Sequence, residues 1–248
     1  MSKSIFHYTK KFEYLCDIIE KGFIPSFCEE MLCTKSHCIK FAIPSLCFCD
    51  IPITQAQEHK DKYGEFAIGV KKKWAIKNDI NPITYLNSNS NIADATMAVV
   101  DYYKQSLCKL KGKKLSNANY NYLRTISHLK NYSGDLPKRK LKNINFYEEK
   151  EWRYVPTIAD TQGNDCCLSF EENQLKRLKK EYPKKPHLPQ CAIPLKVKNI
   201  SHLIVPNQTE KYNFIKCLKA NKRLTKNDKQ FHILLTKIIT YSEIQDDL

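Results

Sequence analysis

The sequence predicts a mixed α+β fold that forms a single domain over residues 1–248. Short apolar runs typical of buried strands recur along the chain, and stretches with apolar residues at helical spacing lie between them. The content of 42% hydrophobic residues is enough to fill a core in a chain of 248 residues. No internal repeat divides the sequence, which favours one domain over an array.

The N-terminal part of the chain predicts alternating strands and helices. A strand is expected at residues 5–9, followed by a helix that starts near Phe12 and ends at Gly22. Residues 26–43 show no clear periodicity and predict a loop. A helix capped by Thr54 is expected to end at Tyr63. Further strands are predicted at 45–49, 66–70 and 83–86.

A polar, Lys-rich stretch at about residues 87–142 predicts a helical insert. Its helices are expected near 93–110 and 120–128. After the insert, a helix is predicted at 210–222, and strands are predicted at 145–156, 192–196, 202–205 and 231–240.

Charge and cysteine content suggest the partners and the compartment. The 41 Lys and Arg residues against 26 Asp and Glu give a net charge of +15, which favours a polyanion such as nucleic acid. A Lys-rich composition without functional meaning is the alternative. No apolar run is long enough to cross a membrane and no secretory leader precedes the fold, so no membrane contact is expected. The 11 irregularly spaced cysteines are expected to be reduced thiols, which predicts a cytoplasmic protein.

Several common catalytic motifs are missing from the sequence. With six glycines, the chain contains neither a dinucleotide-binding G-x-G-x-x-G nor a phosphate-binding P-loop. It also lacks the C-x-x-C pairs of structural zinc sites, so no metal is expected. Neither a G-x-S-x-G elbow nor an H-E-x-x-H helix is present.

The segment around Glu151 carries the clearest candidate site. If residues 145–156 form a strand, alternation places Glu149, Glu151 and Arg153 on one face and Trp152 on the other. Two carboxylates and a guanidinium then share one surface. An ordinary Glu–Arg pair on a solvated edge strand is the alternative interpretation.

The segment around Glu151 can also be interpreted together with three motifs elsewhere in the chain. The sequence reads Phe-His-Tyr-Thr at 6–9, Cys-Phe-Cys-Asp-Ile-Pro at 47–52, Tyr-Gly at 63–64 and Glu-Lys-Glu-Trp-Arg at 149–153. In this order and spacing it resembles the AbiGi-type abortive phage-resistance proteins, and more distantly ADP-ribosyltransferases such as the DarT-like toxins. The resemblance implies an ADP-ribosyltransferase-like fold, with a split mixed β-sheet core and a helical insert.

The resemblance also implies NAD as the substrate and a role for each site residue. Glu151 is expected to stabilise the cation-like transition state of nicotinamide release, and Glu149 to orient or deprotonate the acceptor. His7 is expected to bind a ribose hydroxyl. The residues expected to bind NAD are His7, Tyr8, Thr9, Phe48, Asp50, Tyr63 and Arg153. Phe48 or Tyr63 would stack on nicotinamide, and Arg153 would bind the diphosphate or only pair with a Glu.

Together these inferences predict a mono-ADP-ribosyltransferase toxin of an anti-phage abortive-infection or toxin–antitoxin system. Its acceptor is expected to be a macromolecule, RNA or DNA rather than protein, and a cognate antitoxin protein is a further expected partner. Two alternatives remain. The chain is a non-enzymatic antitoxin or binding module that keeps a transferase-like fold, or an enzyme that hydrolyses NAD without an acceptor.

Overall fold

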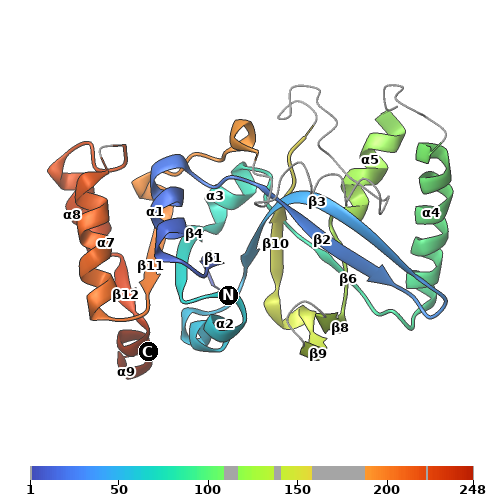
Figure 1. The fold of residues 1–248 in the computed structure, drawn as a ribbon, viewed down its shortest axis with the longest axis horizontal. Coiled ribbons are helices and arrows are strands. Elements are labelled where there is room, and N and C mark those ends of the chain that lie inside the picture. The colour runs from blue at the N-terminus through green and yellow to red at the C-terminus, as the bar shows by residue number, and fades with distance from the viewer. Residues whose placement is uncertain (1, 109–116, 137–140, 158–187, 222, 248) are drawn as a thin grey trace. The chain divides into compact units, whose positions relative to one another are not determined.

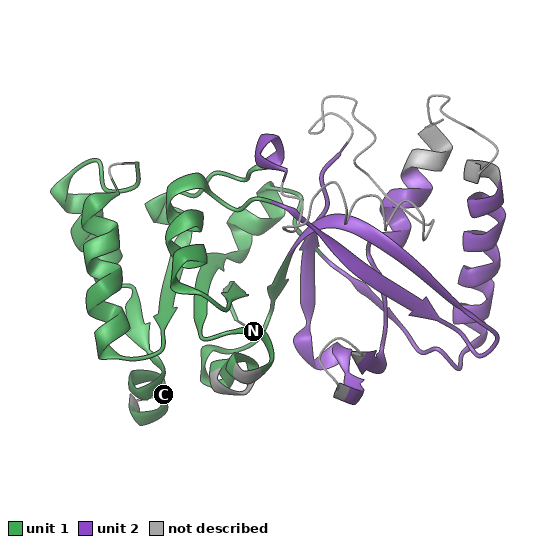
Figure 2. Cartoon of the chain, viewed as in Figure 1, with its two compact units in different colours: residues 1–24, 47–81, 192–248 green, residues 25–46, 82–191 purple. Residues whose placement is uncertain are grey.

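The computed structural model describes residues 2–108, 117–136, 141–157, 188–221 and 223–247 (Figure 1). The chain divides into two compact units, each built from segments that are distant in sequence (Figure 2). The first unit contains Met1–Ile24, Cys47–Asn81 and Ala192–Leu248, and the second contains Pro25–Leu46 and Pro82–Cys191. The short strand β5 (Asn81–Pro82) lies where the chain passes from one unit to the other.

The first unit is built on a mixed sheet in the strand order β12-β11-β4-β1-β3, with β4 at its centre. Its strands are β1 (Ser4–Thr9), the end of β3 (Cys38–Cys49), β4 (Phe66–Lys71), β11 (Ile200–Val205) and β12 (Ile238–Thr240). Strand β1 pairs antiparallel with β4 and with the end of β3, and β4 pairs antiparallel with β11. Strands β11 and β12 are parallel, which requires the helical crossover that α7 and α8 provide between them.

Helices cover this sheet, so its central strands are apolar on both faces. They are α1 (Phe12–Lys21), α2 (Ala56–Tyr63), α3 (Lys72–Lys77), α7 (Gln208–Ala220), α8 (Asp228–Leu235) and α9 (Tyr241–Asp247), with short 3₁₀ turns at Ile53–Gln55 and Val197–Asn199. Phe6, Ala67 and Ile204 pack with Tyr241 and Ile244 in one buried cluster. Helix α1 ends at Gly22, whose φ of 86° suits glycine.

The second unit combines a long hairpin, two short strand pairs and two helices. The hairpin joins β2 (Ser26–Cys33) to β3, with Ser26 opposite Ser45 and Cys33 opposite Cys38. Its other elements are β6 (Thr84–Leu86), α4 (Asn91–Cys108), α5 (Asn117–Ile126), β7 (Leu129–Asn131), β8 (Ser133–Leu136), β9 (Leu141–Asn145), β10 (Glu151–Tyr154), and 3₁₀ turns η3 (Phe146–Glu149) and η4 (Pro189–Cys191). Strand β6 runs parallel to β7, and β8 runs antiparallel to β9.

One face of the hairpin forms the core of the second unit. The buried residues of this cluster come from the hairpin, α4, α5 and strands β6 and β7: Leu32, Ile39, Phe41, Ile43, Leu86, Ala93, Met97, Val100, Tyr122, Leu123, Ile126 and Leu129. The ring of Tyr103 stacks on that of Tyr122, with centroids 4.3 Å apart. Helix α4 is therefore held against the hairpin by one apolar stripe.

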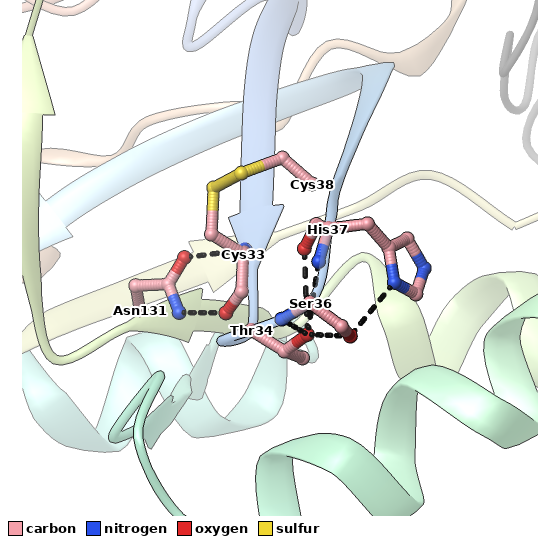
Figure 3. The surroundings of a disulfide bond; sticks show 6 residues. All are labelled: Cys33, Thr34, Ser36, His37, Cys38 and Asn131. Carbon is pink, nitrogen blue, oxygen red and sulfur yellow. Dashed lines mark hydrogen bonds between the residues drawn. A yellow bond between two sulfur atoms is a disulfide. The ribbon is translucent and has the colours of Figure 1, made fainter.

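A disulfide bond joins Cys33 and Cys38 at the end of the hairpin (Figure 3). The buried Asn131 holds the same point, because its amide donates to the carbonyl of Cys33 and accepts from the Cys33 N–H, both at 2.8 Å. His37 in the turn pairs with Asp101 of α4 at 2.9 Å. The expectation that the cysteines are all reduced is therefore wrong for this pair.

The mixed α and β character is confirmed, but several predicted elements are wrong. Residues 26–43 form a hairpin of β2 paired with β3 and not a loop. The strand was missed because only Leu32 of β2 is buried, so its sequence shows no alternation of buried and exposed residues. Residues 231–240 contain the end of α8 and then β12, and 192–196 contribute only a bridge between Ile193 and Phe23. Thr54 does not cap α2, whose N-cap residue is Gln55. None of the described helices is long and apolar enough to span a bilayer.

The predicted insert has a mixed structure in the described part. It contains α4 and α5, as expected, but also β7 and β8. The basic runs at 109–114 and 176–185 lie outside the described residues, as does most of the run at 138–142. The prediction of one domain over residues 1–248 stays a prediction.

A capping box starts the last helix. The N–H of Thr240 donates to Oε2 of Glu243 at 2.7 Å, and the N–H of Glu243 donates to Oγ1 of Thr240 at 3.3 Å. Lys211 of α7 donates to Oε1 of Glu243 at 2.6 Å. This bond, with those from Thr240 and Gln208, lowers the pKa of Glu243 from 4.5 to about 2 although partial burial opposes the shift.

We expect Glu243→Gln to lower the free energy of unfolding by about 1 kcal/mol near neutral pH, since the site is partly exposed. A lowered carboxyl pKa stabilises the fold above the ordinary value of 4.5, and this stability is lost as pH falls toward about 2. The difference between wild type and variant should therefore shrink between these pH values. Urea unfolding at several pH values measures it, and a constant difference would contradict the assignment.

Candidate functional site

Five charged side chains from four elements meet in the second unit. They are Glu30 of β2, Lys130 of β7, Glu149 at the end of η3, and Glu151 and Arg153 of β10. Arg153 is fully buried, and the exposed fractions of Glu149 and Glu151 are 7% and 4%. We refer to these five residues as the ionic cluster.

Glu151 lies at the centre of the ionic cluster. Its Oε1 accepts from Nε of Arg153 at 2.7 Å, and its Oε2 accepts from Nζ of Lys130 at 3.0 Å. Its backbone N–H donates to the hydroxyl of Tyr85 at 2.8 Å, and its carbonyl accepts from the N–H of Ile83 at 3.1 Å. Both carboxylate oxygens and both backbone polar groups of Glu151 are therefore hydrogen-bonded within the unit.

Arg153 connects β10 to two further elements. Its NH1 donates to the carbonyl of Ser127 just after α5 at 2.7 Å, and its NH2 donates to Oε1 of Glu30 at 2.8 Å. With the bond to Glu151, the guanidinium uses three of its nitrogens in different directions. A buried guanidinium is tolerated only when its donors are satisfied in this way.

Lys130 is the second cation of the ionic cluster. Its Nζ lies 2.8 Å from Oε2 of Glu149 and 4.9 Å from the centre of the Phe146 ring. Burial lowers the pKa of Lys130, but the negative charges of Glu151 and Glu149 outweigh it and hold the pKa well above 10.5. Lys130 is therefore a permanent cation over the physiological pH range.

The backbone around Lys150 lets Glu149 and Glu151 approach the same cation. Glu149 ends the 3₁₀ turn η3, and Lys150 takes a left-handed conformation with a φ of 43° before β10 begins at Glu151. The prediction of one strand through 145–156 is thus wrong for its first part. Glu151 and Arg153 do share one face of β10, as predicted, whereas Glu149 reaches the cluster through the turn.

The sequence did not point to Glu30 or Lys130 as members of this cluster, nor to Tyr85 as a hydrogen-bond partner of Glu151. Glu30 was expected in a loop, and Lys130 followed a predicted helix. Residues that close an ion pair from a distant segment leave no local pattern, and the separations from Arg153 to Glu30 and from Glu151 to Lys130 are 123 and 21 residues.

The remaining predicted residues lie in the first unit. His7 of β1 places Nδ1 2.8 Å from the carbonyl of Cys47, so Nδ1 carries the proton in this contact. Its ring lies 5.4 Å from the ring of Phe23 and 5.5 Å from that of Phe48. Phe48 is fully buried, so its ring is part of the core in this structure.

The other first-unit residues make contacts of their own. The centroid of the His59 ring lies 5.9 Å from that of Tyr8 and 5.7 Å from that of Tyr63. Burial raises the pKa of the Tyr8 hydroxyl above its ordinary value. Thr9 is buried at the end of β1. Asp50 forms an ion pair with Lys72 at 2.6 Å. The predicted pairing of His7 with Glu151 joins residues of two different units and stays a prediction.

A pocket of about 470 Å³ opens in the first unit, and none of the predicted residues lines it. It is lined by Ser201, His202, Lys211, Thr236, Lys237, Ile238, Ile239 and Glu243. Lys237 is held by the carbonyls of Val197 and Ile200, and burial lowers its pKa. In the part of the chain that the structure describes, no group of three or more acidic, His or Cys residues is placed to hold a metal ion.

The chemistry of the ionic cluster is that of a structural network. Both carboxylate oxygens of Glu151 accept hydrogen bonds from cations of the cluster. Its backbone N–H and carbonyl are bonded to Tyr85 and Ile83 of the same unit. Buried ion pairs of this kind hold segments in a defined arrangement, and their net stability depends on every partner being present.

Comparison with known proteins decides the family. A family model described as "Putative abortive phage resistance protein AbiGi, antitoxin" matches residues 21–206. The chain belongs to the AbiGi family. It is also 29% identical over 222 residues to the "Abortive phage resistance protein AbiGi" of Lactococcus lactis subsp. cremoris, an alignment that covers 83% of this chain and 88% of that protein. No solved structure matches the chain.

This result corrects the main functional prediction. The AbiGi resemblance is confirmed, and with it a place among abortive phage-resistance proteins. The predicted role as a toxin that transfers ADP-ribose is wrong, because the family is described as an antitoxin. The resemblance to DarT-like toxins and the ADP-ribosyltransferase-like arrangement of the sheet gain no support, since no solved structure matches.

The ionic cluster makes a prediction about stability. We expect Glu151→Ala to lower the free energy of unfolding by about 3–5 kcal/mol, because it leaves Arg153 and Lys130 buried without a shared partner. Glu148→Ala, at an exposed position of η3, is the matched control and should cost less than about 1 kcal/mol, because it removes only an exposed hydrogen bond from Asn145. Denaturant unfolding of both variants measures the difference. Equal stability of the two variants would refute the structural role.

Proposed function

We propose that this chain is a non-enzymatic antitoxin that protects its host cell by neutralising the toxin of the same abortive-infection system. The observation that carries the proposal is the antitoxin description of the family that matches residues 21–206. The related Lactococcus protein is named for abortive phage resistance, and the alignment covers most of both chains.

The ionic cluster is consistent with a non-enzymatic role. Glu151 was the predicted catalytic residue, yet its carboxylate is 4% exposed and bound by Arg153 and Lys130. Such a residue is suited to hold β10 in place. The transferase motifs of the sequence are then explained as parts of the scaffold, because a fold can keep the residues of a site without keeping its reaction.

The net charge of +15 supports a partner of opposite charge. Opposite net charges speed association through long-range attraction, whereas they contribute less to the final affinity. We therefore expect the cognate toxin, or the part of it that this chain recognises, to be acidic.

Co-expression tests the proposed function directly. Expressed alone in a bacterial host, the chain should leave growth unchanged, and expressed with the toxin encoded beside it, it should restore growth that the toxin arrests. The matched control is the same plasmid with an early stop codon. Growth arrest by this chain alone, or failure to rescue at equal protein levels, would overturn the proposal.

A further inference from the structure

The pocket of about 470 Å³ in the first unit is the cavity with the clearest binding chemistry in the described part of the chain. Residues of β11, α7, β12 and α9 line it, together with the turn between α8 and β12 (Figure 1). Pockets for small molecules have volumes of about 300–1,000 Å³, whereas a cavity for one water needs only about 15 Å³. The pocket is therefore large enough for an organic ligand.

Lys237 brings a positive charge to the wall of this pocket. Its ammonium group donates to the carbonyls of Val197 and Ile200 at 2.8 and 2.6 Å. Carbonyl groups orient an ammonium ion but do not neutralise its charge, and Lys237 forms no ion pair with any described residue. An ammonium group has three N–H donors, so one donor of Lys237 remains for a ligand.

The other charges near Lys237 do not balance it. Burial lowers the pKa of Lys237, and the positive charge of Lys71 lowers it further. Lys211, the second lysine of the pocket, is already neutralised by Glu243 at 2.6 Å. Among the residues that line the pocket, one positive charge thus remains unpaired. A cation that is partly removed from water is costly without a counter-ion, so this position attracts an anion.

Two neutral polar groups beside this charge also lack partners. Nδ1 of His202 and Oγ of Ser201 are buried and have no hydrogen-bond partner among the described residues. Burial, followed by the charge of Lys237, lowers the pKa of His202. Buried polar atoms in native proteins are nearly always paired. Unpaired atoms on residues that line a pocket therefore indicate a partner from outside the chain.

The remaining walls indicate the class of this partner. Ile238 and Ile239 of β12 give the pocket an apolar side, which suits the organic part of a ligand. The basic residues of the lining are lysines, which bind phosphate as point charges, whereas a carboxylate is matched best by the planar fork of arginine. A phosphate monoester carries a charge of about −1.5 to −2 near pH 7 and has three strong acceptor oxygens.

We propose that this pocket binds a small organic phosphate. Lys237 holds the phosphate group, His202 is its hydrogen-bonding neighbour, and the two isoleucines contact the organic part. The inference goes beyond the proposed antitoxin function and does not depend on it, because it rests on residues of the pocket alone. It names a ligand site and no reaction.

Calorimetry with purified full-length chain tests the proposal. The probes are adenosine 5′-monophosphate and ribose 5-phosphate, with adenosine and ribose as the matched ligands without phosphate. Inorganic phosphate tests whether the anion alone is enough, and benzoate tests a carboxylate with an apolar body. We expect at least one phosphate ester to bind about ten-fold more tightly than its unphosphorylated counterpart, inorganic phosphate and benzoate.

Two variants and a control assign the binding to the pocket. Lys237→Met removes the unpaired charge and should weaken binding of the ester at least about ten-fold. Lys198→Met removes the same charge from an exposed position that does not line the pocket, and it should stay within about two-fold of wild type. Thr236→Trp fills space in the pocket from an exposed position and keeps Lys237, so it should also weaken binding. Circular dichroism and thermal unfolding establish that each variant is folded.

The outcomes decide the proposal without reference to the toxin. It is overturned if neither ester binds wild type with a Kd below about 1 mM, or if Lys237→Met and Lys198→Met bind equally well. Equal or tighter binding of benzoate or inorganic phosphate would replace the organic phosphate by a carboxylate or a simple anion. If Lys237→Met does not fold, unchanged affinity of Thr236→Trp overturns the site. Growth rescue in the co-expression experiment reports the antitoxin function separately.

Discussion

The ion pair between Glu151 and Arg153 is the interaction on which the second unit depends. Arg153 is fully buried and connects β10 to Glu30 of the hairpin and to the end of α5, while Glu151 brings in Lys130 of β7. Removing these charges from water is costly, and the cost is offset only when every donor and acceptor is satisfied. Glu151 and Arg153 are neighbours on one strand, but Glu30 and Lys130 come from segments distant in sequence, so the full network forms only when these segments have found their places. The network therefore specifies the arrangement of the unit more than it adds to its stability.

How far the sequence predicts the structure depends on what surrounds each segment. Strands β1, β4 and β11 were predicted because both of their faces are covered, which leaves continuous apolar runs. The hairpin strand β2 was missed because only Leu32 among its residues is buried, so no alternation marks it. The apolar run from Phe231 to Thr240 is compatible with helix or strand, and the structure uses it for both. The alternation that joins Glu151 to Arg153 is local and was found.

The family of the chain and the role of Glu151 rest on different observations. Membership of the AbiGi family follows from a match over residues 21–206, whereas the contacts of Glu151 with Arg153 and Lys130 show only how its carboxylate is held in the fold.

The most direct test of this account is toxin rescue by Glu151→Gln, measured at a temperature at which circular dichroism shows the variant to be folded. The substitution keeps the size of the side chain and one acceptor oxygen but removes the carboxylate that a transferase would need. The account predicts that Glu151→Gln restores growth in the presence of the toxin as well as the wild-type chain does. Loss of rescue by a folded, equally abundant variant would contradict it and would return Glu151 to an active site.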